Sequence, residues 1–137
     1  MALTHLLDTS VHTRLNHPTV RSAVEPLAAA GRAARAGISD LEIGFSARNA
    51  TEWNQLTSAL TVFDLVETTA RHIQRARTVQ RQLALTSQRG RKIPDLLVAA
   101  AAEQAGLTVL HYDTDFDIIS AVTGQACEWV TPPGTIS

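Results

Sequence analysis

Short apolar runs alternate along this chain with longer segments in which apolar residues recur at helical spacing. The short runs predict strands at residues 3–7, 32–38, 60–65, 107–112 and 128–131, although the second run is rich in Ala and Arg and also suits a helix. The longer segments predict helices at residues 10–15, 18–30, 39–48, 52–60, 68–85 and 94–105. Strands that alternate with helices are typical of an α/β protein, so we expect a three-layer α/β/α fold around a central parallel sheet of about four to five strands.

Several helix ends carry recognisable signals. Pro94 opens one helix and Gly106 is expected to end it, because proline suits the first helical turn and glycine the left-handed residue after the last. Ser39-Asp40-Leu41-Glu42 has the form of a capping box, which predicts that a helix begins at Ser39. The helix over 68–85 is expected to bury Ile73, Ala76, Val79 and Leu83.

The composition is that of an ordinary globular protein. With 137 residues, 45% of them hydrophobic and 18% charged, the chain is expected to form one domain over residues 1–137. No apolar run approaches the roughly 18–20 residues that cross a bilayer, and no secretion signal is expected at the N-terminus. The single cysteine, Cys127, excludes an intrachain disulfide and a cysteine-based zinc cluster, which suits a cytoplasmic protein.

The net charge of −1 hides an uneven distribution of charge. Lys92 is the only lysine, and no Lys or Arg follows it. No acid lies between Glu67 and Asp95, a stretch that holds Arg71, Arg75, Arg77, Arg81, Arg89, Arg91 and Lys92. Because arginine can donate two parallel hydrogen bonds to a phosphate, this stretch predicts contact with nucleic acid, chiefly through Arg71, Arg75, Arg89, Arg91 and Lys92. The alternative is a solvated helix face with no ligand.

Acidic residues stand where a parallel sheet would bind a ligand. Asp8 directly follows the first predicted strand and Asp113 a later one, so both should emerge at the same sheet edge. Asp95 and Glu42 lie near the starts of helices in a similar topological position. Each also has a purely structural explanation, since Glu42 would complete the capping box and Asp95 would favour the helix dipole.

The segment Asp113-Thr114-Asp115-Phe116-Asp117 places three carboxylates within five residues. If the segment is extended, its alternate residues share a face, and the like charges raise one another's pKa. A hard divalent cation would relieve this repulsion, and carboxylates suit Mg²⁺ or Mn²⁺. An acidic turn without a ligand is the alternative.

Four segments together resemble the acidic motifs of PIN-domain ribonucleases, in particular the VapC-like toxins of bacterial type II toxin–antitoxin pairs. They are Leu6-Leu7-Asp8-Thr9-Ser10, Ser39-Asp40-Leu41-Glu42, Ile93-Pro94-Asp95-Leu96-Leu97-Val98-Ala99-Ala100 and Asp113-Thr114-Asp115-Phe116. The third and fourth are the most specific, and the resemblance spans residues 3 to about 130.

The resemblance implies a site and an activity. The catalytic acids would be Asp8, Glu42, Asp95 and Asp113. The ligands of Mg²⁺, or of Mn²⁺, would be Asp8, Asp95, Asp113 and Asp115. Asp117 falls outside the family's pattern, and the hydroxyl of Thr9 or Ser10 would support the first acid. The implied activity is hydrolysis of RNA phosphodiesters by a metal-activated water, and the implied partners are a VapB-like antitoxin and a second copy of the chain.

Two other functions are compatible with parts of the sequence. Asp8 could be the nucleophile of a haloacid-dehalogenase-type phosphatase, but Ser10 stands where that chemistry wants a second Asp, and Lys92 is its only candidate lysine. A noncatalytic PIN module that binds RNA or protein is the other alternative. Such a module is expected to have lost some acids, and here none is missing.

Overall fold

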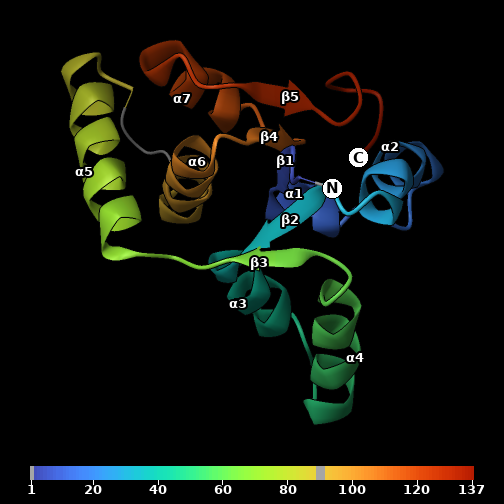
Figure 1. Cartoon of the computed structure of the whole chain (residues 1–137). Helices are drawn as coiled ribbons and strands as arrows, with labels where there is room; N and C mark the ends of the chain where they lie inside the picture. Colours follow the sequence, from blue (N-terminus) through green and yellow to red (C-terminus); the bar gives the residue numbers. More distant parts are fainter. Residues whose placement is uncertain (1, 89–91) are drawn as a thin grey trace.

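Five parallel strands form the centre of the computed structural model, which describes residues 2–88 and 92–137 (Figure 1). The strands are β1 (His5–Leu7), β2 (Ala33–Ala36), β3 (Asp64–Val66), β4 (Thr108–His111) and β5 (Cys127–Trp129). Their order in the sheet is β3-β2-β1-β4-β5, and Leu6 in the central strand is level with Ala34 on one side and Val109 on the other. The predicted parallel sheet is thus confirmed.

The described part of the chain contains seven helices. They are α1 (Thr9–His12), α2 (Pro18–Ala29), α3 (Gly37–Phe45), α4 (Ala50–Leu60), α5 (Ala70–Leu85), α6 (Ile93–Ala105) and α7 (Asp115–Thr123). In Figure 1, α5, α6 and α7 lie on one side of the sheet, α1 and α2 on the other, and α3 and α4 extend beyond β3. This is the predicted three-layer α/β/α arrangement. None of these helices has the length and apolar character required to cross a membrane.

Two apolar clusters pack on the two faces of the sheet. Leu6 belongs to the cluster under α5, α6 and α7, whereas its neighbour Leu7 belongs to the cluster under α2. This alternation is expected because successive side chains of a strand point to opposite faces. Both leucines are fully buried, so β1 is the central strand of the core as well as of the sheet.

Local signals explain where several helices begin and end. Thr69 caps α5, since its hydroxyl accepts a hydrogen bond from His72 N while the His72 ring accepts one from Thr69 N. Gly106 ends α6 in the left-handed conformation, with a φ of 71°, as predicted.

Two sequence-based expectations are wrong, and the structure decides one question that the sequence left open. Ser39 caps no helix, because α3 begins at Gly37 and Ser39 lies buried inside it. Asp113 to Asp117 is not extended, because α7 begins at Asp115 and buries Phe116 and Ile119 one helical turn apart. Ile73 is 45% exposed, and His72 takes the buried position on α5 in its place.

Candidate metal centre and active site

The candidate site lies beside β1 and β4, where the order in which the chain adds strands to the sheet reverses. β1 and β4 are neighbours, and the chain runs outward from them to β2 and β3 on one side and to β5 on the other. Asp8 follows β1, Asp113 lies two residues beyond β4, and Asp8 N donates a hydrogen bond to Leu110 O at 2.9 Å. Ligands of open parallel sheets bind in the crevice at such a switch point. The two aspartates therefore emerge together at the expected edge.

Ser10 holds the first aspartate in place. Its main-chain N and its hydroxyl both donate to Asp8 Oδ2, at 3.0 and 2.6 Å. Ser10 Oγ also accepts a hydrogen bond from Tyr112 N at 2.9 Å. The hydroxyl thus ties the turn after β1 to the end of β4 and fixes one oxygen of Asp8 beside the cavity.

A group of carboxylates gathers beside Asp8. Oxygen atoms of Asp95, Asp113 and Asp115 all lie within 4.8 Å of one another. Asp95 belongs to the first turn of α6, and Asp113 Oδ1 accepts a hydrogen bond from Asp115 N at 2.9 Å where α7 begins. Asp95 is only 5% exposed, and its Oδ2 has no hydrogen-bond partner in the described part of the chain. A buried carboxylate oxygen of this kind needs a cation or a proton.

Lys92 supplies the nearest positive charge. Its Nζ lies 2.8 Å from Asp113 Oδ2 and 3.9 Å from Asp95 Oδ2. The hydrogen bond to Asp113, reinforced by the charges of Asp95, Asp113 and Asp115, raises the pKa of Lys92 despite partial burial. Lys92 was predicted to bind nucleic acid, and the structure places it against the acids themselves.

The acids have very different affinities for a proton. Burial, the charge of Asp8 and a hydrogen bond with Asp115 raise the pKa of Asp95 to about 8, against a smaller opposing effect of Lys92. Burial also raises the pKa of Asp8, although the hydrogen bonds from Ser10 oppose this. Burial would raise the pKa of Asp113 as well, but the hydrogen bonds from Lys92 and Asp115 N outweigh it and lower the pKa. The raised pKa of Asp95 therefore reflects burial and repulsion among the carboxylates, which Lys92 offsets only in part.

Glu42 reaches the same cavity from α3. Its Oε1 lies 2.7 Å from Thr9 Oγ1, which in turn lies 2.8 Å from the buried Ser39 Oγ. The serine predicted to form a capping box with Glu42 thus orients Thr9, which orients Glu42. A cavity of about 240 Å³ is lined by all four predicted catalytic acids, Asp8, Glu42, Asp95 and Asp113.

The two remaining acids of the D-x-D-x-D segment separate. Asp115 stays with Asp95 and Asp113, whereas the carboxylate of Asp117 accepts a hydrogen bond from Trp129 Nε1 at 3.1 Å. The separation follows from the helix, because residues two apart on α7 point in different directions. Asp117 therefore lies outside the carboxylate group.

This donor set fits a hard divalent cation. It consists of carboxylate oxygens without a cysteine or histidine among them, the ligand type that Mg²⁺ and Mn²⁺ prefer. The unpartnered oxygen of Asp95 and the raised pKa values are what such a cation would relieve. The structure thus contains a buried acidic cluster able to hold a metal ion.

Comparisons with known proteins agree with this geometry. The family profile described as PIN domain matches residues 5–122. This chain belongs to the PIN-domain family. Ribonuclease VapC51 of Mycobacterium tuberculosis is 65% identical over 136 residues, which cover 99% of each chain, and Ribonuclease VapC21 of the same species is 44% identical over 139 residues, covering 98% of this chain and 99% of the relative.

Solved structures show the same fold at low sequence identity. A DNA-bound VapBC from Salmonella typhimurium superposes with a TM-score of 0.77 at 15% identity, over 94% of this chain and 99% of that one. VapBC-5 from Mycobacterium tuberculosis gives 0.65 at 22% identity, over 96% and 98%. The predicted PIN-like fold is confirmed, and family membership leaves the haloacid-dehalogenase alternative without support.

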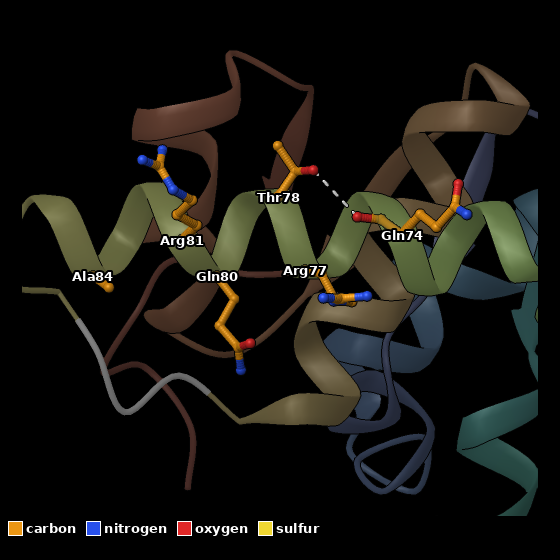
Figure 2. Close-up of a pocket in the computed structure, with 6 residues that line it drawn as sticks. All are labelled: Gln74, Arg77, Thr78, Gln80, Arg81 and Ala84. Atoms are coloured by element: carbon orange, nitrogen blue, oxygen red, sulfur yellow. Dashed lines mark hydrogen bonds between the residues drawn. The ribbon is translucent and has the colours of Figure 1, made fainter.

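The arginines predicted to bind nucleic acid are in unequal situations in this PIN domain. Arg71 is exposed on α5, whereas Arg75 donates two hydrogen bonds to Glu103 of α6, at 2.6 and 3.1 Å. Arg89 and Arg91 lie outside the described residues. Figure 2 shows the outward surface of α5, where a shallow hollow of about 660 Å³ is lined by Gln74, Arg77, Thr78, Gln80, Arg81 and Ala84.

Three residues that line the acidic cavity were not among the sequence-based candidates, namely Thr13, Arg14 and Tyr112. Arg14 lies just after α1, and Tyr112 lies between β4 and Asp113. Tyr112 was expected in the core or at an interface, and Arg14 stands alone in its stretch of sequence, outside the arginine-rich segment. The one signal available for Tyr112 was its position next to a predicted metal ligand.

Proposed function

We propose that this PIN domain is the ribonuclease toxin of a toxin–antitoxin pair and that it hydrolyses RNA phosphodiesters with Mg²⁺, or Mn²⁺, as its cofactor. The observation that carries the proposal is the convergence of Asp8, Asp95, Asp113 and Asp115 at one sheet edge, with a buried oxygen of Asp95 that accepts no hydrogen bond from the described residues. The near-full-length match to proteins named ribonuclease VapC supports the choice of RNA as substrate.

The proposed ligands are the carboxylates of Asp8, Asp95, Asp113 and Asp115. A bound divalent cation would supply a nucleophilic water at neutral pH and offset the charge that develops on the phosphodiester. Ser10 keeps one oxygen of Asp8 fixed beside the cavity. Glu42, held by Thr9, lines the same cavity and would orient the attacking water or accept a proton from it.

The partners proposed for this protein follow from its relatives. The solved neighbours are VapBC proteins, and we propose a VapB-like antitoxin and a second copy of this chain as partners. Arg71, Arg75, Arg89, Arg91 and Lys92 remain the proposed contacts to RNA. Residues 1–137 are proposed to act as one domain in the cytoplasm, where RNA substrates are found.

Cleavage of labelled RNA by the purified protein tests the proposal. We expect cleavage with Mg²⁺ or Mn²⁺, none in chelator, and loss of cleavage in Asp95→Asn. Asp117→Asn is the matched control, because it makes the same change two residues beyond the ligands, at a carboxylate bonded to Trp129. Equal cleavage in chelator would contradict the metal requirement, and equal loss in both variants would contradict the assignment of the ligands.

A further inference from the structure

We propose that Arg14 binds a backbone phosphate of the RNA at the mouth of the acidic cavity, and that Tyr112 and the C-terminal residues 132–137 position it there. The inference rests on the proposed ribonuclease function and adds a substrate-binding residue to it. Arg14 and Tyr112 both line the cavity that holds Asp8 and Asp95.

The guanidinium of Arg14 is held from three directions. Nη1 donates to Ser10 O at 2.8 Å, and Nε donates to Ser137 O at 3.0 Å. Cζ lies 5.0 Å from the centre of the Tyr112 ring, within the range of a cation–π contact. These contacts fix the side chain before any ligand arrives, so little rotamer entropy would be lost on binding.

Tyr112 anchors the segment that holds Arg14. Its hydroxyl donates to Ile136 O at 2.7 Å and accepts from Gly134 N at 2.9 Å. Ile136 packs against the apolar cluster under α2, which fixes the segment at a second point. Tyr112 contacts Arg14 and directly precedes Asp113. The position of Arg14 is therefore linked to that of a proposed metal ligand.

The charges at the cavity favour a phosphate at Arg14. A polyanion is repelled by the acids, and among the described residues the cations that line the cavity are Lys92 and Arg14. Lys92 is paired with Asp113, whereas no Asp or Glu side chain in the described residues forms an ion pair with Arg14. Within the same residues Nη2 of Arg14 has no hydrogen-bond partner, so a donor remains for a phosphate oxygen.

Kinetics of RNA cleavage separate this role from a structural one. Arg14→Gln keeps an N–H donor for the main chain but removes the charge, and we expect KM to rise about tenfold with kcat nearly unchanged. Arg14→Lys restores the charge and should recover part of the loss. Arg21→Gln is the matched control, because Arg21 is an exposed arginine of α2 that also donates to a main-chain oxygen, that of Asn16.

Binding of RNA to the Asp95→Asn protein provides a readout that does not depend on cleavage. Loss of one phosphate contact should reduce the slope of log Kd against log salt by about 0.7 in Arg14→Gln and leave it unchanged in Arg21→Gln. Tyr112→Phe keeps the ring but frees residues 132–137, and it should raise KM less than Arg14→Gln does. If the wild-type protein binds RNA without cutting it, the proposed function is contradicted. The salt slope can still be measured, so the proposal for Arg14 is tested separately.

Three results would overturn the inference. The first is a lower melting temperature in Arg14→Gln with KM and salt slope unchanged, which would make Arg14 a structural clamp. The second is a fall in kcat with KM unchanged, and the third is an equal effect of Arg21→Gln. If Arg14→Gln does not fold, Arg14→Lys is measured in its place. We expect Arg14→Lys to keep the wild-type slope of log Kd against log salt, and a reduced slope would contradict the phosphate contact.

Discussion

Replacing Asp95 with Asn should make the metal-free protein more stable, and increasingly so as the pH rises. Asp95 is buried, and one of its oxygens has no hydrogen-bond partner among the described residues. Asparagine has nearly the same shape but cannot ionise, so it removes the buried charge without opening a cavity. A substitution in an active site that stabilises the fold indicates a position kept for function.

The magnitude follows from the pKa of Asp95. Its rise from 3.8 to about 8 means that folding favours the protonated carboxyl. Between these two values the folded state holds a proton that the unfolded state has released, so stability falls as pH rises, by at most about 1.4 kcal/mol per pH unit. The full cost above pH 8 is at most about 6 kcal/mol, and we expect about 2 kcal/mol or more after relaxation of neighbouring groups.

Urea unfolding in chelator measures this effect. The free energy of unfolding of wild type and of Asp95→Asn is compared at about pH 5 and about pH 8.5, and the difference should grow with pH. Taking a difference removes contributions that both proteins share. One is that of His12, whose pKa is lowered by burial to about 4, so its contribution to stability rises with pH up to about 6.5.

Asp64→Asn is the control, because it makes the same change at an exposed residue of β3. We expect it to leave the pH dependence of stability unaltered. Added Mg²⁺ or Mn²⁺ should stabilise wild type and Asp64→Asn but hardly Asp95→Asn. A constant difference between wild type and Asp95→Asn across the pH range would refute the reasoning, because no proton would then be linked to folding at this residue.

Two further substitutions test the supports of the site and of α3. Ser10→Ala removes both the hydroxyl donor to Asp8 and the acceptor for Tyr112 N, and urea unfolding should show a loss of about 1–3 kcal/mol, against almost none for the exposed Ser22→Ala. Gly44→Ala places a Cβ 2.7 Å from Trp53 Nε1, so the indole must move; its fluorescence should shift to the red, and the usual helix gain of up to about 1 kcal/mol should be absent.

The parts of the site that the sequence predicted are those fixed by chain order. Asp8 and Asp113 follow strands that apolar runs make recognisable, and parallel pairing brings the ends of such strands to one edge. Asp95 sits one turn into a helix that Pro94 opens. Parallel pairing of the two strands thus predicts that Asp8 and Asp113 converge, whereas the pattern alone does not fix Asp95 at the same edge.

The wrong expectations depend on contacts between distant segments. Ser39 reads locally as a cap, but its hydroxyl bonds to Thr9, thirty positions earlier in the chain. By contrast, the strand predicted over the Ala-rich 32–38 is confirmed, because β2 pairs with β1 and β3 in spite of its helix propensity. The helix that begins at Asp115 was not predicted from the sequence. Its signal is the spacing of Phe116 and Ile119, which lie on one helix face.

Arg14 illustrates a third kind of residue, for which the sequence offers no pattern at all. Its place is set by a ring at Tyr112 and by main-chain oxygens at Ser10 and Ser137, which come from three separate parts of the chain. A main-chain oxygen has the same chemistry in every residue, so it leaves no trace in residue type. Such a position can be found only from coordinates.

The chain, rather than the cation, fixes the acids in place. Asp8 Oδ2 accepts two hydrogen bonds from Ser10, and Asp113 Oδ1 accepts one from Asp115 N. One oxygen of each carboxylate is thus fixed by a residue two positions further along the chain. The other oxygen of Asp113 meets Lys92, and Asp95 Oδ2 meets no donor in the described residues. A site whose ligands are fixed by local hydrogen bonds needs little rearrangement to take up an ion, because the energetic cost of gathering the charges has already been met by folding. Metal binding should therefore stabilise the fold by an amount that grows with the cation concentration relative to its Kd, and Asp95→Asn should lose most of that gain.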